Sequence, residues 1–84
     1  MSGLVRSLVG HDKGEVFCVV GEEAPYLLLC DGKNRRQSAP KRKKEMHTCA
    51  VAFDHPTLQK IVRHEPVTDK EIRRALATFR AKEV

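Results

Sequence analysis

The sequence predicts one small domain that is mainly β and ends in an α-helix. Residues 4–30 hold three short stretches of β-branched and apolar residues, separated by turns that contain glycine. Residues 68–84 instead repeat apolar side chains at helical spacing. The chain has 84 residues, a length that leaves room for a single hydrophobic core.

The predicted strands lie at residues 4–9, 15–20 and 24–30, and we expect them to form an antiparallel meander. The first turn has glycine at both ends, Gly10 and Gly14. The third strand is followed by Asp31 and Gly32, a tight hairpin signal because glycine adopts a positive φ without steric cost. Further along, residues 35–37 are expected to add a short edge strand, and residues 46–53 another strand.

Residues 54–67 are predicted to be a linker that contains a short apolar cluster. Leu58, Ile61 and Val62 have helical spacing, so the cluster is either one turn of helix or a packed loop. The final helix is predicted over residues 69–82, because Thr68 and Glu71 have the spacing of a capping box. Its apolar stripe is expected to pack on the β domain. The stripe consists of Ile72, Ala75, Leu76 and Phe79.

Positive charge is concentrated in one segment. The chain carries 16 Lys and Arg against 11 Asp and Glu, a formal net charge of +5, yet residues 33–44 hold seven bases and no acid. Such a block is consistent with a solvated loop or a targeting signal. It is also the composition of a surface that binds nucleic-acid phosphates, which we consider the better interpretation in so small a protein. Charge alone does not distinguish RNA from double-stranded DNA.

Two sequence motifs follow one another along the chain in the order found in a known protein family. Residues 3–7, the turn from Gly10 to Gly14 and residues 16–20 together resemble a KOW motif. After the turn at Asp31 and Gly32, basic residues and a Pro-Lys-Arg-Lys-Lys run at 40–44 precede His47. With these features, residues 3–49 resemble the bacterial KOW-domain RNA-binding proteins, which are similar to the ribosomal protein family called L-fourteen-e.

The resemblance implies a small, strongly bent barrel of five strands, of the Src-homology-three (KOW) type, that binds ribosomal RNA. We therefore expect a barrel domain over residues 1–53, followed by the linker at 54–67 and an amphipathic helix at 68–84 packed on the barrel. His11 and Glu15 stand where the motif often has basic residues. The acidic pair at 22 and 23 also argues against RNA contacts at the next turn.

We therefore expect a non-catalytic RNA-binding protein, ribosome-associated or ribosomal-protein-like, that contacts phosphates of structured RNA. The alternative is a protein-interaction adaptor that uses the KOW barrel in transcription or translation, through its acidic turns or the 58–62 cluster. The predicted RNA contacts are Lys33, Arg35, Arg36, Lys41, Arg42, Lys43 and Lys44, with Lys13 as a marginal member. A second candidate RNA face on the final helix consists of Lys70, Arg73, Arg74 and Arg80, which a solvated helix explains equally well.

Other functional classes find little support in the sequence. No acid–base pair or nucleophile spacing suggests an enzyme, and no small-molecule substrate or cofactor is expected. Cys18, Cys30 and Cys49 form no Cys-x-x-Cys pair, so we expect no metal and interpret them as core thiols in a reducing compartment. The longest apolar run is too short to span a membrane, and the N-terminus lacks signal-peptide features. We expect a cytoplasmic monomer.

Overall fold

The computed structural model describes residues 3–83, which form five β-strands, one short 3₁₀ helix and two α-helices. Along the chain the elements are β1 (Gly3–Ser7), β2 (Val16–Glu23), β3 (Tyr26–Cys30), β4 (Lys41–Lys44), η1 (Glu45–His47), β5 (Thr48–Val51), α1 (Pro56–Val62) and α2 (Asp69–Lys82). The predicted class, mainly β with a C-terminal helix, is confirmed. Domain bounds predicted at residues 1 and 84 lie outside the described residues.

All five strands belong to one antiparallel sheet with the order β4-β3-β2-β1-β5. The first three strands form the expected meander, and the chain then returns so that β5 pairs with β1. A register shift between Val19 and Gly21 interrupts the β2–β3 ladder, and bulges of this kind bend and twist a sheet. Within residues 3–83 no ladder joins β4 to β5, so the sheet is open.

The edge strand lies later in the chain than the sequence predicted. Residues 35–37 are not a strand, and β4 begins at Lys41, so a loop of residues 31–40 replaces the tight hairpin expected at Asp31 and Gly32. Asp31 Oδ1 accepts hydrogen bonds from the backbone N–H groups of Lys33 (2.8 Å) and Arg35 (2.9 Å). These bonds hold the chain in a local turn, which prevents its backbone from joining the sheet.

Two further boundaries differ from the prediction. The strand expected at 46–53 is divided into η1 and the shorter β5. The predicted linker contains α1, whose first residue is Pro56, and the ring of His55 caps it by accepting a hydrogen bond from the N–H of Thr57 at 3.2 Å. Proline at the first helical position needs no hydrogen-bond partner, which explains the helix start that apolar spacing alone left open.

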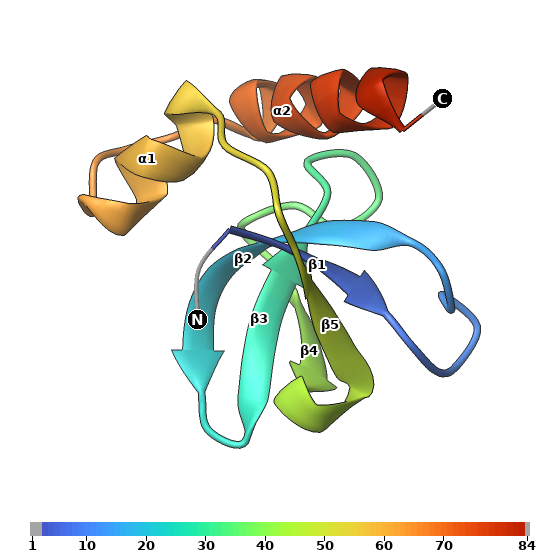
Figure 1. The fold of residues 1–84 in the computed structure, drawn as a ribbon. Helices are drawn as coiled ribbons and strands as arrows, with labels where there is room; N and C mark the ends of the chain where they lie inside the picture. The colour runs from blue at the N-terminus through green and yellow to red at the C-terminus, as the bar shows by residue number, and fades with distance from the viewer. Residues whose placement is uncertain (1–2, 84) are drawn as a thin grey trace.

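Apolar residues from both faces of the sheet are buried, and they form two clusters. The first lies between the sheet and the helices, which Figure 1 shows together on one side of it. It contains Leu4, Val16, Cys18, Cys30, Leu58, Ile72, Leu76 and Phe79. The second cluster, formed by alternate residues of the same strands, contains Val5, Phe17, Val19, Leu27 and Leu29. Because side chains alternate along a strand, neighbours such as Leu4 and Val5 enter different clusters.

Helix α2 has the bounds predicted from the sequence. Thr68 Oγ1 accepts from the N–H of Glu71 at 3.1 Å, and the Glu71 carboxylate accepts from the N–H of Thr68 at 3.0 Å, so the capping box is confirmed. The predicted apolar stripe is buried against the sheet. Neither helix formed by residues 3–83 combines the length and the hydrophobicity that crossing a membrane requires.

Candidate nucleic-acid interface

Strand β4 carries four consecutive bases, and they divide between the two faces of the sheet. Lys41 lies opposite Leu29 and Lys43 opposite Leu27 in the ladder with β3. Directly opposed residues share a face, so these two lysines lie on the side of the second apolar cluster. Their ammonium groups extend toward the β1–β2 loop.

Both ammonium groups converge on the buried carboxylate of Asp12. Lys43 Nζ lies 2.8 Å from Oδ1, and Lys41 forms an ion pair with Oδ2. The side chains of Asp12 and Lys43 are only 7% and 10% exposed. Ser7 Oγ donates to the same carboxylate at 2.8 Å. These contacts fix the edge strand to the loop that begins at Gly10. They also compensate the charges of Lys41 and Lys43, two residues that were predicted to contact RNA.

The environment of Asp12 favours its ionised form. Burial by itself would raise the pKa of the carboxyl group, because it disfavours the charge. Hydrogen bonds from Lys41, Lys43 and Ser7 outweigh that effect and hold the pKa of Asp12 well below its ordinary value. Asp12 is therefore charged at neutral pH, and its pairing with the two lysines persists under physiological conditions.

The other two bases of β4 lie on the opposite face of the sheet, where Arg42 is paired with Leu28 and Lys44 with Tyr26. Arg42 places its guanidinium 4.6 Å from the ring centre of Tyr26, and its Nε lies 3.2 Å from a carboxylate oxygen of Glu23. Both members of this ion pair are more than half exposed, so it contributes little to stability. Lys44 is exposed and forms no ion pair with any residue from 3 to 83.

The loop of residues 31–40 is docked on the start of α2. Arg73 Nη1 donates to the carbonyl of Gly32 at 2.7 Å. The Gln37 backbone N–H donates to Asp69 Oδ1 at 3.0 Å, and its side-chain amide donates to the carbonyl of Val67 at 2.9 Å. Figure 1 shows this loop rising from the sheet to the underside of α2. The docking brings the basic loop and the basic flank of the helix together.

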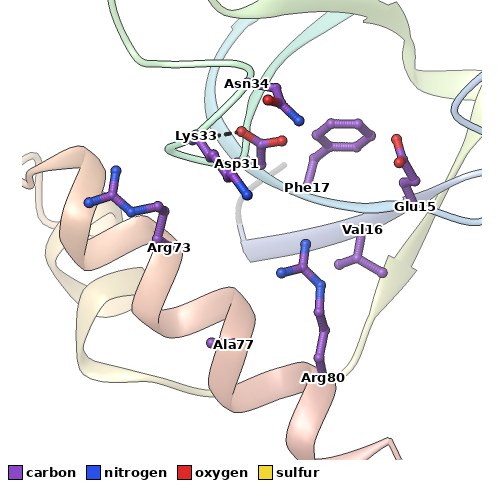
Figure 2. Close-up of a pocket in the computed structure, with 9 residues that line it drawn as sticks. All are labelled: Glu15, Val16, Phe17, Asp31, Lys33, Asn34, Arg73, Ala77 and Arg80. Carbon is purple, nitrogen blue, oxygen red and sulfur yellow. Dashed lines mark hydrogen bonds between the residues drawn. The ribbon is translucent and has the colours of Figure 1, made fainter.

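A cavity of about 400 Å³ lies between this loop, α2 and the start of β2. Three cationic side chains line it, Lys33 from the loop and Arg73 and Arg80 from the helix. Figure 2 shows Arg80 extending from α2 toward Val16 and Phe17. The remaining lining residues are Glu15, Val16, Phe17, Asp31, Asn34 and Ala77. Residues from both of the predicted RNA faces therefore line one cavity.

The predicted contact residues fall into three groups by their partners. Lys41, Arg42 and Lys43 are ion-paired. A second group is exposed and has no carboxylate partner among residues 3–83; it consists of Lys13, Lys33, Arg35, Arg36, Lys44, Lys70, Arg74 and Arg80. Arg73 forms a third group: it is exposed and has no carboxylate partner among residues 3–83, but it donates a hydrogen bond to the carbonyl of Gly32.

Helical geometry separates the four bases predicted on the second face. At about 100° per residue, Arg73 and Arg80 lie within about 20° of each other, on the flank that faces the loop. Lys70 and Arg74 lie farther round, roughly opposite the buried stripe, and neither lines the cavity. Lys13 is exposed in the β1–β2 loop beside Asp12 and also lies outside the cavity.

The three glycines predicted at turns all have positive φ, although the tight hairpin expected at Asp31 and Gly32 is replaced by the longer loop. Gly10 and Gly14 both have positive φ, and the loop between them is closed by a hydrogen bond from the N–H of Lys13 to the carbonyl of Gly10 at 3.2 Å. Gly32 has φ +77°, and a Cβ atom there would lie 2.3 Å from the carbonyl oxygen of Asp69. Only glycine allows the loop to approach the helix so closely.

The cysteines are placed differently from one another. Cys18 and Cys30 are buried as expected, and burial raises the pKa of each thiol to about 12. The expectation of a core thiol is wrong for Cys49, which is exposed on the edge strand β5. In the part of the chain from 3 to 83, no three His, Cys, Asp or Glu side chains gather in a way that would hold a metal ion.

Comparison with models of known protein families and with curated proteins gives no match. Function is therefore inferred from the charges, contacts and geometry of the residues described above.

Proposed function

We propose that this protein is a non-catalytic RNA-binding protein, ribosome-associated or ribosomal-protein-like, as the KOW resemblance implies. The observation that carries the proposal is the convergence of uncompensated cations on one part of the fold. Lys33, Arg35 and Arg36 extend from a loop that is hydrogen-bonded to the helix bearing Arg73 and Arg80. A surface that presents several unpaired cations attracts phosphates and releases their condensed counterions when it binds them.

We further propose that the sheet is a small, strongly bent barrel of the Src-homology-three (KOW) type. The strand order β4-β3-β2-β1-β5, in which the last strand returns to the first, supports this assignment. The register shift in β2 supplies the bend that such a sheet requires. In this architecture the long β3–β4 loop and η1 lie at opposite ends of β4.

The proposed recognition is of the RNA backbone and its shape. Phe17 and Phe79 are buried, and one face of Tyr26 is covered by Arg42, so few aromatic rings are available to stack on bases. Arginine forks onto phosphate oxygens, while lysine supplies a point charge. Structured RNA, in which phosphates occupy regular positions, is therefore the preferred target over an unpaired single strand.

An adaptor for another protein is the second candidate function. It is favoured by exposed apolar residues in two segments, namely Leu8 and Val9 in the β1–β2 loop and Met46 in η1. Met46 is 76% exposed, and a hydrogen bond from the Leu8 N–H to the His47 carbonyl (3.0 Å) brings the loop and η1 together. Binding through this surface would persist at high salt, unlike binding through phosphates.

Co-sedimentation with ribosomal particles from the protein's own cell extract, in low and high salt, is the first test. We expect co-migration with one subunit at low salt and release at high salt. A protein that stays at the top of both gradients contradicts the ribosomal assignment, and retention at high salt favours the adaptor.

A variant then tests the surface. The triple substitution Arg35→Gln, Arg36→Gln and Lys44→Gln removes three unpaired charges without breaking an ion pair among residues 3–83. If all three contact phosphates, the slope of log affinity against log salt should decrease by about two to three. The control is Arg63→Gln, which removes an exposed arginine whose partner is Glu65. An unchanged slope in the triple variant contradicts the proposed surface.

A further inference from the structure

The cavity between α2 and the β3–β4 loop combines cations with an unpaired carboxylate, which plain phosphate binding does not require. We propose that it takes one ribonucleotide unit of the bound RNA, with the phosphate on Lys33 and Arg80 and the 2′-hydroxyl donating to Glu15. This inference rests on the proposed RNA-binding function and adds the site at which RNA is distinguished from DNA.

Two of the three cations, Lys33 from the loop and Arg80 from α2, point toward the same space, whereas the Arg73 guanidinium points away from it, toward the Gly32 carbonyl (Figure 2). Arg80 extends into the cavity without a carboxylate partner among residues 3–83, and Lys33 is likewise unpaired. Arg73 donates to the Gly32 carbonyl, so its role is to hold the loop that carries Lys33 against α2. Two hydrogen bonds join the loop to α2 and a third joins it to Val67, just before the helix, so the backbone segments that carry Lys33 and Arg80 are held together before a ligand arrives.

Two carboxylates also line the cavity, and they are in different situations. Asp31 already accepts two backbone N–H groups of its own loop, so its role is structural. Glu15 is exposed, its carboxylate has no hydrogen bond or ion pair among the described residues, and it lies with the cations around the same space. A carboxylate next to a phosphate site repels the ligand unless the ligand also supplies a donor.

RNA supplies such a donor at every nucleotide. The 2′-hydroxyl donates as well as accepts, and its absence from DNA is what allows a protein to discriminate between the two. Unpaired Glu15 would therefore bind RNA through a charge-assisted hydrogen bond and repel DNA. The cavity volume of about 400 Å³ is in the range of small-ligand pockets, and Val16, Phe17 and Ala77 offer apolar contacts to a sugar ring.

The test measures binding of a fluorescently labelled RNA stem-loop and of versions in which single nucleotides are 2′-deoxy. For the wild-type protein, one deoxy position should weaken binding by about tenfold, the value of one hydrogen bond to a charged group. In the Glu15→Ala variant, a 2′-deoxy nucleotide at the same position should no longer weaken binding, because the carboxylate that accepts from the 2′-hydroxyl is absent. The matched control is Glu45→Ala, which removes an exposed carboxylate outside the cavity and should preserve the sensitivity.

Arginine variants test the phosphate end of the site. Arg80→Gln should reduce the slope of log affinity against log salt by about one, the value for one phosphate contact. It should also weaken RNA binding more than Arg74→Gln, which makes the same change of charge on the outward side of α2. Equal losses in the two variants, or equal deoxy sensitivity in Glu15→Ala and Glu45→Ala, overturn the inference and leave the RNA-binding function standing. A wild-type protein that binds neither the stem-loop nor ribosomal particles overturns both.

Discussion

Lys43 places its ammonium nitrogen 2.8 Å from the carboxylate of Asp12, a residue 31 positions earlier in the chain. Asp12→Asn removes the charge that compensates Lys43 and Lys41, leaving two largely buried cations without a partner. Breaking a buried ion pair from one side costs about 3–5 kcal/mol, so we expect a large drop in Tm by circular dichroism. Glu45→Gln, on the exposed surface of η1, should leave Tm nearly unchanged.

The same carboxylate predicts how stability depends on pH. The pKa of Asp12 is lower in the folded protein than in the unfolded chain, so its contribution is complete above the unfolded pKa of about 3.9 and is lost as the pH falls toward the folded pKa. Urea titrations between neutral pH and acid should show wild-type stability falling below about pH 4. The difference in free energy of unfolding between wild type and Asp12→Asn should decrease over that range. A constant difference would show that ionisation of Asp12 does not stabilise the fold.

The N-terminus of α2 offers a local test of stability. Thr68→Ala removes the side chain that accepts from the N–H of Glu71, and loss of such a cap costs about 1 kcal/mol. Thr78→Ala is the matched control, because Thr78 Oγ1 only donates to the Arg74 carbonyl within the helix, and alanine is the better helix former. Denaturant unfolding should therefore show a loss for the first variant and none for the second.

Gly32 should be much less tolerant of substitution than Gly14, although both have positive φ. Alanine at either position bears the strain of that conformation, about 1–3 kcal/mol. At Gly32 the new Cβ would also lie 2.3 Å from the Asp69 carbonyl oxygen, whereas at Gly14 it meets nothing within 4 Å. Gly32→Ala should displace the loop and weaken RNA binding, and equal Tm losses in the two variants would contradict this close contact.

Thiol reactivity distinguishes the three cysteines. Burial raises the pKa of Cys18 and Cys30 to about 12, so both remain protonated and shielded at neutral pH. Ellman's reagent should therefore modify one thiol rapidly in the native protein and all three in denaturant. Cys49→Ser should abolish the rapid phase, and a rapid phase that persists in this variant would place a second thiol at the surface.

Sequence reasoning succeeded where the determinants of structure are local. The capping box and the apolar stripe lie within α2 itself, and the predicted bounds agree with the structure. It failed at residues 35–37, because the carboxylate of Asp31 organises a turn that residue propensities do not reveal. The start of α1 was left open for a similar reason, since its capping group is an imidazole, which is not among the usual N-cap residues.

The candidate site was harder to predict from the sequence, because it is formed by tertiary contacts. A run of bases in the sequence gives no sign that Lys41 and Lys43 reach Asp12 and stabilise the fold through this buried carboxylate. The period-2 alternation of a strand was the one available signal, since it separates Lys41 and Lys43 from Arg42 and Lys44. Lys33 and Arg80 line the same cavity because the loop docks on α2, and no short-range sequence pattern encodes that docking.

The hydrogen bonds from Gln37 and Arg73 that fix the β3–β4 loop to α2 have a thermodynamic consequence for binding. A free basic loop would lose conformational entropy when a ligand ordered it, about 1–2 kcal/mol per residue of backbone. Here that loss accompanies folding, so the proposed association with RNA should be a near rigid-body event. Calorimetry should then show a heat-capacity change set by the contact area alone, without the larger signature of a segment that folds as it binds.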